Sequence, residues 1–192
     1  MNAIAIRTKR LVIKDLELAD AETVYHYRSN DDISRYQSFS PGCMDDVNSF
    51  IIENTKQFNI QDNWYQVGVF CNQSVIGDIG IHFIGPDNTQ CEIGYTIGKE
   101  HQKQGFGKEA VMGILDYLFN VLNKHRVVAS LNPCNVASIA LLESIGFRRE
   151  ARFLKSIYNN GEWEDDMWFG ILKEEWKEKT AVDDRRTSRE SD

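Results

Sequence analysis

Two glycines follow a short polar run in the middle of the chain. The run Gln102-Lys-Gln-Gly-Phe-Gly107 separates an alternating apolar pattern over residues 91–97 from a helical pattern that begins at Lys108. Glycine permits backbone conformations and close ligand approach that other residues block. The first amides of a helix have no intrahelical acceptor, and the helix dipole favours an anion beside them. This spacing predicts an anion-binding turn suited to a pyrophosphate.

Two other phosphate-binding motifs partly match the same residues. Gly105-Phe-Gly-Lys-Glu-Ala110 fits the G-x-G-x-x-A pattern of dinucleotide-binding folds. Such a fold needs an acidic residue at the end of the next strand to hold the ribose, whereas the strand predicted at residues 126–131 ends in Asn132-Pro133. A P-loop needs Ser or Thr after Gly107-Lys108, and Glu109 stands there. A plain strand-to-helix loop and nicotinamide binding stay as alternatives.

A mixed α/β frame is predicted to position this turn. Helical periodicity covers about residues 20–28, 47–58, 108–122 and 136–144. Strand patterns cover residues 10–16, 64–70, 73–83, 91–97, 126–131, 148–158 and 163–171. Short turns between residues 64 and 97 predict an antiparallel meander, and Asn159-Asn-Gly161 predicts a hairpin. Strand 126–131 can lie parallel to strand 91–97 only through the intervening helix.

Composition and charge exclude several classes of protein. The chain has 192 residues, 42% of them hydrophobic, which is typical of one globular domain. A formal charge of −7 argues against nucleic-acid binding. Without an apolar run of ~20 residues or a signal-peptide layout, we expect a cytoplasmic protein with no membrane contact. Residues 1–176 should form the domain, and the charged tail 177–192 should be disordered.

The cysteines and histidines predict no metal site. The four cysteines form no C-x-x-C pair, and the four histidines show no metal-ligand spacing. In a reducing compartment we expect the cysteines to be free thiols that pack as small apolar groups.

The order of the motifs resembles the GNAT superfamily of acyl-CoA-dependent N-acyltransferases, above all its branch of ribosomal-protein N-terminal acetyltransferases. The resemblance covers about residues 5–176. The motifs that carry it are, in chain order, Thr8–Ile13, Glu92–Tyr95, Gln102–Gly107, Asn135–Ser138, Gly146-Phe147 and Tyr158–Asp166. It implies the GNAT fold, with a mostly antiparallel twisted sheet of about seven strands and about four flanking helices. A parallel strand pair should splay apart around the cofactor.

The resemblance also implies acetyl-CoA as the co-substrate and no metal. The residues implied to contact it are Gln102, Gln104, Gly105, Phe106, Gly107 and Lys108 at the pyrophosphate, Tyr95, Thr96 and Ile97 along the pantetheine arm through their backbone, and Asn135 through its side chain. From its position after a Pro turn, Asn135 fits a helix N-cap equally well, and both roles are compatible.

Acyl transfer to an amine needs an uncharged nucleophile and a stabilised leaving thiolate. Lysine amines titrate near ~10.4 and α-amines near ~7.7–8.0, so a lysine acceptor depends more on a base. Glu92, on the strand beside the expected thioester, is the candidate base, and a solvated strand residue is its alternative. The family's usual tyrosine is replaced by Leu142, which leaves Ser138 to stabilise the thiolate. An acyl-Cys134 route is less favoured, because no histidine is placed to activate that thiol.

The expected reaction is direct acetyl transfer from acetyl-CoA to a primary amine. A protein N-terminal α-amine is the first expected acceptor, and a polyamine or an aminoglycoside-like amine is the second. A non-catalytic acyl-CoA-binding module is the alternative of another class. The first two helices and the last hairpin should wall the acceptor site, where Glu162, Glu164, Asp165 and Asp166 could attract a cationic amine. A homodimer is left open.

Overall fold

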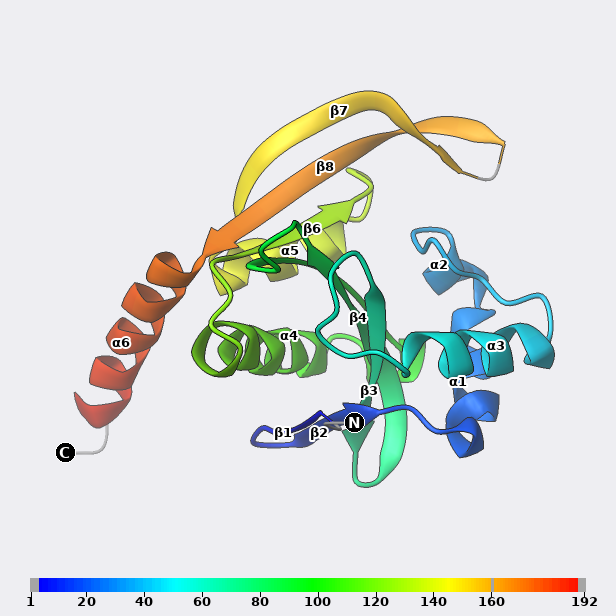
Figure 1. Ribbon diagram of the computed structural model, residues 1–192, viewed down its shortest axis with the longest axis horizontal. Helices are drawn as coiled ribbons and strands as arrows, with labels where there is room; N and C mark the ends of the chain where they lie inside the picture. Colours follow the sequence, from blue (N-terminus) through cyan, green and yellow to red (C-terminus); the bar gives the residue numbers. More distant parts are fainter. Residues whose placement is uncertain (1–3, 160, 190–192) are drawn as a thin grey trace.

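A twisted sheet with the strand order β1-β2-β3-β4-β5-β6-β8-β7 runs through the molecule (Figure 1). The computed structural model describes residues 4–159 and 161–189. Neighbouring strands are antiparallel except for β5 and β6, which are parallel. The strands are β1 (Ala5–Arg7), β2 (Leu11–Asp15), β3 (Trp64–Cys71), β4 (Ser74–Ile84), β5 (Gln90–Ile97), β6 (Arg126–Leu131), β7 (Arg148–Asn159) and β8 (Glu162–Leu172).

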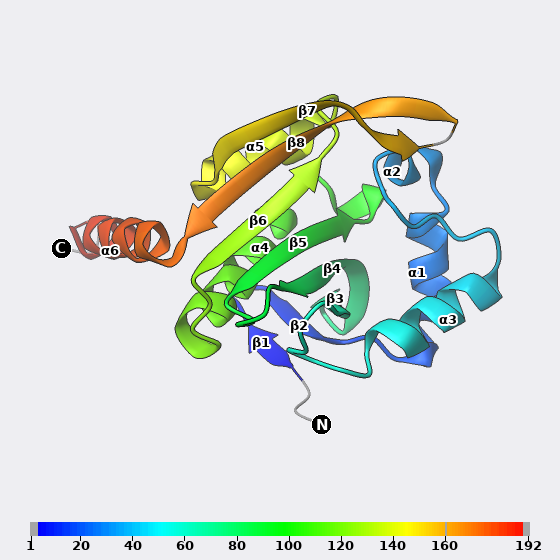
Figure 2. The ribbon, with the colours of Figure 1, turned by 45° about the horizontal axis from the view of Figure 1, so that its top comes forward.

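Helices cover both faces of the sheet, with α4 and α5 on one face and α1 and α3 on the other (Figure 2). No helix within the described residues is long and apolar enough to span a membrane. The helices are α1 (Ala21–Arg28), α2 (Asp31–Ser34), α3 (Met44–Asn54), α4 (Phe106–Asp116), α5 (Val136–Ile145) and α6 (Lys173–Arg189), with short turns η1 (Leu18–Asp20), η2 (Lys99–His101) and the π-helical η3 (Tyr117–Val121).

All seven strands and all four helices expected from the sequence are present, and two short elements were missed. β1 has only three residues, too few for a periodic signal, and it pairs with β2. α2 is a single polar turn whose N-cap, Asn30, accepts a hydrogen bond from the Asp32 amide at 3.0 Å. Of the expected hairpin turn, Asn160 lies outside the described residues, and Asn159 pairs with Glu162 across it.

Helix α6 corrects the expectation of disorder for residues 177–189, because the helix continues to Arg189. Residues 190–192 lie outside the described residues. Its first turn is anchored, since Trp176 is 2% exposed and packs in the main core. Glu175 accepts a hydrogen bond from the Leu172 amide at 2.7 Å and pairs with Arg148. Lysine, glutamate and alanine favour helix even where there is little to bury. The helix extends away from the sheet in Figure 1.

Strands β5 and β6 pair over only three positions. The last paired residues are Glu92 and Val128, although β5 runs on to Ile97 and β6 to Leu131. Beyond that point β5 is hydrogen-bonded to β4 alone. The strands therefore part into a wedge, as expected, and leave one edge of β5 open to a ligand.

Helix α5 closes the side of this wedge. It ends at Gly146, which adopts the left-handed conformation, at φ 109°, that is typical of a helix C-cap. The amides of Gly146 and Phe147 both bond the carbonyl of Leu142, at 3.1 and 3.0 Å. Phe147 is then buried in the core, which fixes the end of the helix.

A buried ion pair joins α1 to the sheet. Arg28 donates to Asp78 on β4 through Nη2 at 2.5 Å and through Nε at 2.9 Å. Tyr27 and Gln66 also donate to the Asp78 carboxylate. Arg28 further donates to the carbonyl of Phe39 at 3.2 Å. This network therefore ties the segment between α2 and α3 to the centre of the sheet.

Asp78→Asn tests the weight of this network. The substitution keeps the shape but leaves Arg28 as an unpaired buried cation, so the free energy of unfolding should fall by about 3–5 kcal/mol. Glu143→Gln is the control, because it breaks an exposed pair with Arg149 and should change stability by no more than about 1 kcal/mol. Urea unfolding followed by tryptophan fluorescence measures both. Equal losses in the two variants would contradict this assignment.

Candidate active site

The glycine turn has the geometry of an anion site. Gly105 is the N-cap of α4 and adopts a left-handed conformation at φ 81°. The amides of Phe106, Gly107 and Lys108 occupy the first turn of α4, where no intrahelical acceptor exists. With the helix dipole behind them, they present positive potential to the space in front of the turn.

Arg10 holds this turn from the side. Its Nη1 donates to the carbonyl of Gln104 at 3.0 Å, and its guanidinium lies 4.3 Å from the centre of the Phe106 ring. Glu109 fixes Arg10 by accepting from its Nε at 2.6 Å and from its amide at 2.7 Å. The Thr8 hydroxyl donates to the same carboxylate at 2.6 Å. The β1–β2 turn thus clamps the start of α4.

A groove of about 550 Å³ opens in front of the turn; we call it the turn groove. Tyr95, Thr96 and Ile97 of β5 form one wall, and α5 forms the other. Its described lining also includes Gln102, Gly105, Gly107, Lys108 and Asn135. The side chains of Gln104 and Phe106 point elsewhere, toward Glu100 and toward Arg10, which leaves their amides as the groups that could serve a ligand.

The turn groove fits a long phosphorylated molecule. Anion-binding amides lie at one end, and the open edge of β5 offers backbone groups along the wall. The Thr96 hydroxyl is buried without a hydrogen-bond partner among the described residues. The carbonyl of Ile97 is already engaged, because Gln102 Nε2 donates to it at 2.9 Å. Of the three expected backbone positions, Ile97 therefore has its carbonyl occupied by the protein itself.

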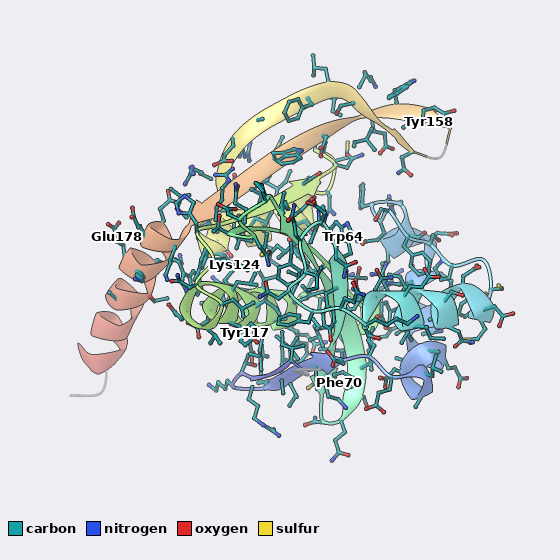
Figure 3. The ribbon with its side chains drawn as sticks, viewed as in Figure 1. Trp64, Phe70, Tyr117, Lys124, Tyr158 and Glu178 are labelled. Carbon is teal, nitrogen blue, oxygen red and sulfur yellow. The ribbon has the colours of Figure 1, made fainter. Side chains whose placement is uncertain are left out.

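A second cavity of about 430 Å³ lies on the other side of the wedge; we call it the acid-lined cavity. Glu92, Glu164, Asp165 and Asp166 supply its carboxyl groups. The tip of the β7–β8 hairpin borders it, and Figure 3 shows Tyr158 near that tip and Trp64 on the sheet below. The residues that line both cavities are Tyr36, Gln37, Tyr95, Asn135 and Ser138.

Glu92 is a half-buried carboxylate in the acid-lined cavity, with 22% of its side chain exposed. Burial, the largest influence, raises its pKa; His82 opposes the rise and Asp166 adds to it. His82 Nδ1 lies 3.7 Å from Glu92 Oε2, and the His82 ring stacks on Trp64 at 4.9 Å. Glu92 is therefore a largely buried strand residue with His82 beside it, and its role as the base stays a prediction.

Three polar groups meet where the two cavities join. Asn135 caps α5 by accepting from the Ser138 amide at 3.2 Å, so its N-cap role is confirmed while its side chain still lines both cavities. The Tyr95 hydroxyl donates to the Ser138 carbonyl at 3.3 Å, and burial raises the pKa of Tyr95 to about 12. Leu142, which stands at the position of the family's usual tyrosine, is fully buried. A phenol still reaches this point, because the Tyr95 hydroxyl extends to it from β5.

The other acidic candidates differ in what neutralises them. Asp165 is paired with Arg152 at 2.6 Å. Asp166 accepts from Ser130 at 2.6 Å and from the Trp168 indole at 2.5 Å, without a basic partner among the described residues. Glu164 accepts from Asn132 at 2.8 Å. Glu162 is exposed and lines neither cavity, which removes it from the site.

The sequence missed three side chains of this site. Arg10 reaches it from a distant segment, and His82 stands opposite Glu92 in the β4–β5 register. The Tyr95 side chain was missed because its residue was considered only for its backbone. The meander itself held one usable signal, since antiparallel pairing places a β4 residue beside Glu92.

A match to a family profile shows which protein family this chain belongs to. The profile of the acetyltransferase (GNAT) domain matches residues 10–148. The chain belongs to the GNAT family of acetyltransferases. It is an acetyl-CoA-dependent N-acetyltransferase.

Relatives of this acetyltransferase extend over nearly its whole length. The N-acetyltransferase YnaD of Bacillus subtilis is 33% identical over 171 residues, which are 89% of this chain and 98% of YnaD. The spermidine N(1)-acetyltransferase of Vibrio cholerae is 24% identical over 87% of this chain and 95% of its own. A crystal structure of a GNAT-family acetyltransferase from Bacillus anthracis superposes with a TM-score of 0.81 at 28% identity, covering 89% and 99% of the two chains.

A shorter match reaches an enzyme with a protein substrate. The ribosomal protein uS5-alanine N-acetyltransferase of Escherichia coli is 29% identical over 86 residues, 45% of this chain and 44% of that enzyme. The relatives of this acetyltransferase thus include enzymes named for a polyamine and for a protein substrate.

Arg10→Ala should weaken acetyl-CoA binding about tenfold, because the Gln104 carbonyl and the start of α4 lose their clamp. Lys9→Ala is a matched control, since Lys9 is an exposed neighbour and loses the same charge. Isothermal titration with acetyl-CoA measures both variants. Equal affinities of the two variants would contradict the clamp, because only general electrostatics would then be at work.

Proposed function

We propose that this acetyltransferase moves an acetyl group directly from acetyl-CoA to a primary amine, and that the first acceptor is a protein N-terminal α-amine. The observation that carries the proposal is the position of Glu92. Its carboxylate lines the acid-lined cavity, which joins the turn groove at Tyr95, Asn135 and Ser138. An amine in one cavity and an acyl donor in the other would meet at that junction.

Glu92 is proposed as the base, directly or through one water. A raised pKa makes its carboxylate a stronger base than an exposed glutamate. An α-amine, with an ordinary pKa near ~7.7–8.0, needs little assistance to lose its proton. His82 is proposed to orient the carboxylate from behind, because it contacts Glu92 and lies outside the two cavity linings.

Acetyl-CoA supplies the acetyl group as a thioester, whose sulfur must leave with an electron pair. Two hydroxyls at the junction are suited to stabilise that charge, those of Tyr95 and Ser138. Tyr95 keeps its proton because its pKa is raised to about 12, so it acts as a hydrogen-bond donor. Its present bond to the Ser138 carbonyl is long, at 3.3 Å, and is readily exchanged.

A direct route is favoured over an acyl-cysteine. Among the described residues that line the two cavities, none is a cysteine. Cys134 lies on the loop beside them, with its amide bonded to Asn132 and its carbonyl to Tyr36. The acceptor would therefore arrive as an ammonium and lose one proton to Glu92. Its nitrogen would then attack the thioester carbon itself, the carbon–sulfur bond would break, and a second proton from the nitrogen would end on the departing sulfur.

The rim of the acid-lined cavity supports a polypeptide acceptor. Trp64 and Tyr158 there are 40% and 63% exposed, and Ile157 is 46% exposed, so apolar surface is available around the amine. Such surface suits a chain end that must be held beyond its first residue.

A polyamine is the second candidate acceptor. Glu92, Glu164 and Asp166 line one cavity without a lysine or arginine partner among the described residues. This charge would attract a second cationic amine, and the spermidine N(1)-acetyltransferase among the relatives acts on such a compound by its name.

We place the proposed activity in the cytoplasm. The four cysteines are free thiols, which suits a reducing compartment. A homodimer is the proposed assembly, since β7 is the outer strand of the sheet and exposes Phe153 and Leu154.

Glu92→Gln tests the function and the base together. Thiol release from acetyl-CoA is measured with N-terminal peptides, lysine peptides, polyamines and aminoglycosides. The parent should release thiol with N-terminal peptides first, and the variant should lose about 10²–10⁴ in kcat with unchanged acetyl-CoA affinity. Parent activity should also fall as pH drops through the raised pKa of Glu92. Equal turnover in both proteins would remove Glu92 as the base.

The same substitution has a signature in stability. Folding raises the Glu92 pKa, so burial favours the protonated form at low pH and this contribution is lost as pH rises through the folded pKa. Glu92→Gln removes the cost of the buried charge. Its Tm should therefore match the parent near pH 4 and equal or exceed it at pH 8. Glu162→Gln, at the exposed hairpin tip, controls for the charge change.

Tyr95→Phe tests thiolate stabilisation through binding. The parent should bind CoA more tightly, relative to desulfo-CoA, as pH rises from 7 to 9.5 and the thiol ionises. The variant should lose about tenfold of that gain, because a hydrogen bond to a charged group is removed. Acetyl-CoA, which has no thiolate, should bind both proteins equally. A pH dependence that is the same in both would show that Tyr95 does not contact the sulfur.

A further inference from the structure

Glu92 and Gly94 lie two residues apart on the same face of β5, about 7 Å from each other. On the neighbouring strand β4, His82 pairs with Glu92 and Gly80 pairs with Gly94. On β3, one strand further, Trp64 pairs with His82 and Gln66 with Gly80. If the α-amine of an acceptor is held at Glu92, the rest of that first residue would therefore lie over Gly94.

Gly94 keeps this place open. Its φ is not positive, so the backbone conformation does not call for glycine. A Cβ added there would meet no atom within 4 Å, although Gly80 beside it is crowded by Gln66 and Trp64. Glycine weakens a strand and is often found where another group approaches closely. The absence of a side chain at Gly94 thus leaves space for a ligand and is not needed to relieve backbone strain.

Beyond Gly94 a side pocket of about 200 Å³ extends from the acid-lined cavity, with which it shares Gln37, Ser38, Trp64 and Gly94. Its polar lining includes Arg28, Asn54 and Gln66. Phe39 and Phe50, whose rings stack at 4.4 Å, form an apolar wall.

The polar groups of the side pocket are neutral as a set. Arg28 is 6% exposed and paired with Asp78. Gln66 gives its amide nitrogen to Asp78, and Asn54 gives its own to the Phe50 carbonyl. Neither amide oxygen accepts a hydrogen bond among the described residues, and two of the five Arg28 N–H protons have no acceptor there. A hydroxyl or a carboxamide can use both kinds of group.

Charged side chains fit this pocket poorly. Arg28 and Asp78 already neutralise each other, so a charged side chain would lose its water there without gaining a counter-ion. An anion would also have to pass Glu92, Glu164 and Asp166 in the acid-lined cavity. A large apolar side chain would bury the two amide oxygens without partners, which costs free energy.

We propose that the side pocket binds the side chain of the acceptor's first residue and selects a neutral side chain that carries a hydroxyl or a carboxamide. This rests on the proposed acetylation of N-terminal α-amines and names the residue class which that reaction prefers. Gly94 is the entrance to the pocket, and Asn54 is one of its selecting groups.

The test compares peptides that differ only in a first residue of Gly, Ser, Thr, Asn, Leu, Asp or Lys. In the parent, kcat/KM for Ser, Thr and Asn should exceed that for Leu, Asp and Lys by about tenfold or more. Gly94→Ala and Gly94→Val should remove this advantage in order of size, with the Gly-first peptide little affected and Tm unchanged or higher. Gly42→Ala, outside both cavities, is the control glycine substitution.

Asn54→Leu provides a second, independent variant. It should raise the Leu-to-Asn ratio of kcat/KM about tenfold, because one amide oxygen is exchanged for apolar surface. Direct binding of the peptides to the CoA complex should follow the same order as kcat/KM.

Several outcomes would overturn the side pocket. An equal loss for all peptides in Gly94→Val, including the Gly-first peptide, would place Gly94 beneath the amine itself. First-residue preferences that ignore both variants would show that the pocket is unused. If the parent acetylates polyamines but no peptide, the proposed α-amine acceptor is wrong and the side-pocket proposal fails with it. If the parent acetylates peptides without the expected first-residue preference, only the side-pocket proposal fails.

Discussion

The parting of β5 from β6 is the constraint on which the rest of the site depends. Pairing between β5 and β6 ends at Glu92 and Val128. Helix α5 lies beside the gap between the two strands, and its capped first turn carries Ser138 into that gap. The two cavities meet there because no backbone hydrogen bonds close the space. Glu92 belongs to the last paired position, so the proposed base has a paired strand on each side, β4 and β6.

Several features of this site work against stability and are offset elsewhere. The Glu92 carboxylate is desolvated, the Thr96 hydroxyl is buried without a partner, and Gly94 leaves open space in a strand. The buried pair of Arg28 and Asp78 and the continuous core between the sheet and α4 hold the surroundings in place. Sites that depart from local preference in this way are typical of functional surfaces.

Sequence periodicity was enough for the seven longer strands, for helices α1, α3, α4 and α5 and for the glycine turn, because each has a local pattern. The single turn α2 and the three-residue β1 carry too little pattern, and α6 was missed because its composition reads as unfolded although Trp176 anchors it. Contacts across the fold, such as Arg10 with Gln104 or Tyr36 with Cys134, depend on how distant segments pack. The side pocket has no signal in the sequence at all.

A crystal structure of the complex with CoA would test the central claim most directly. The account predicts the pyrophosphate on the amides of residues 105–108, and the sulfur between Tyr95 and Ser138 with Glu92 open to it across the junction. A sulfur that lies away from the junction, or phosphates bound outside the glycine turn, would contradict the account. It would also remove the basis for placing an acceptor amine at Glu92.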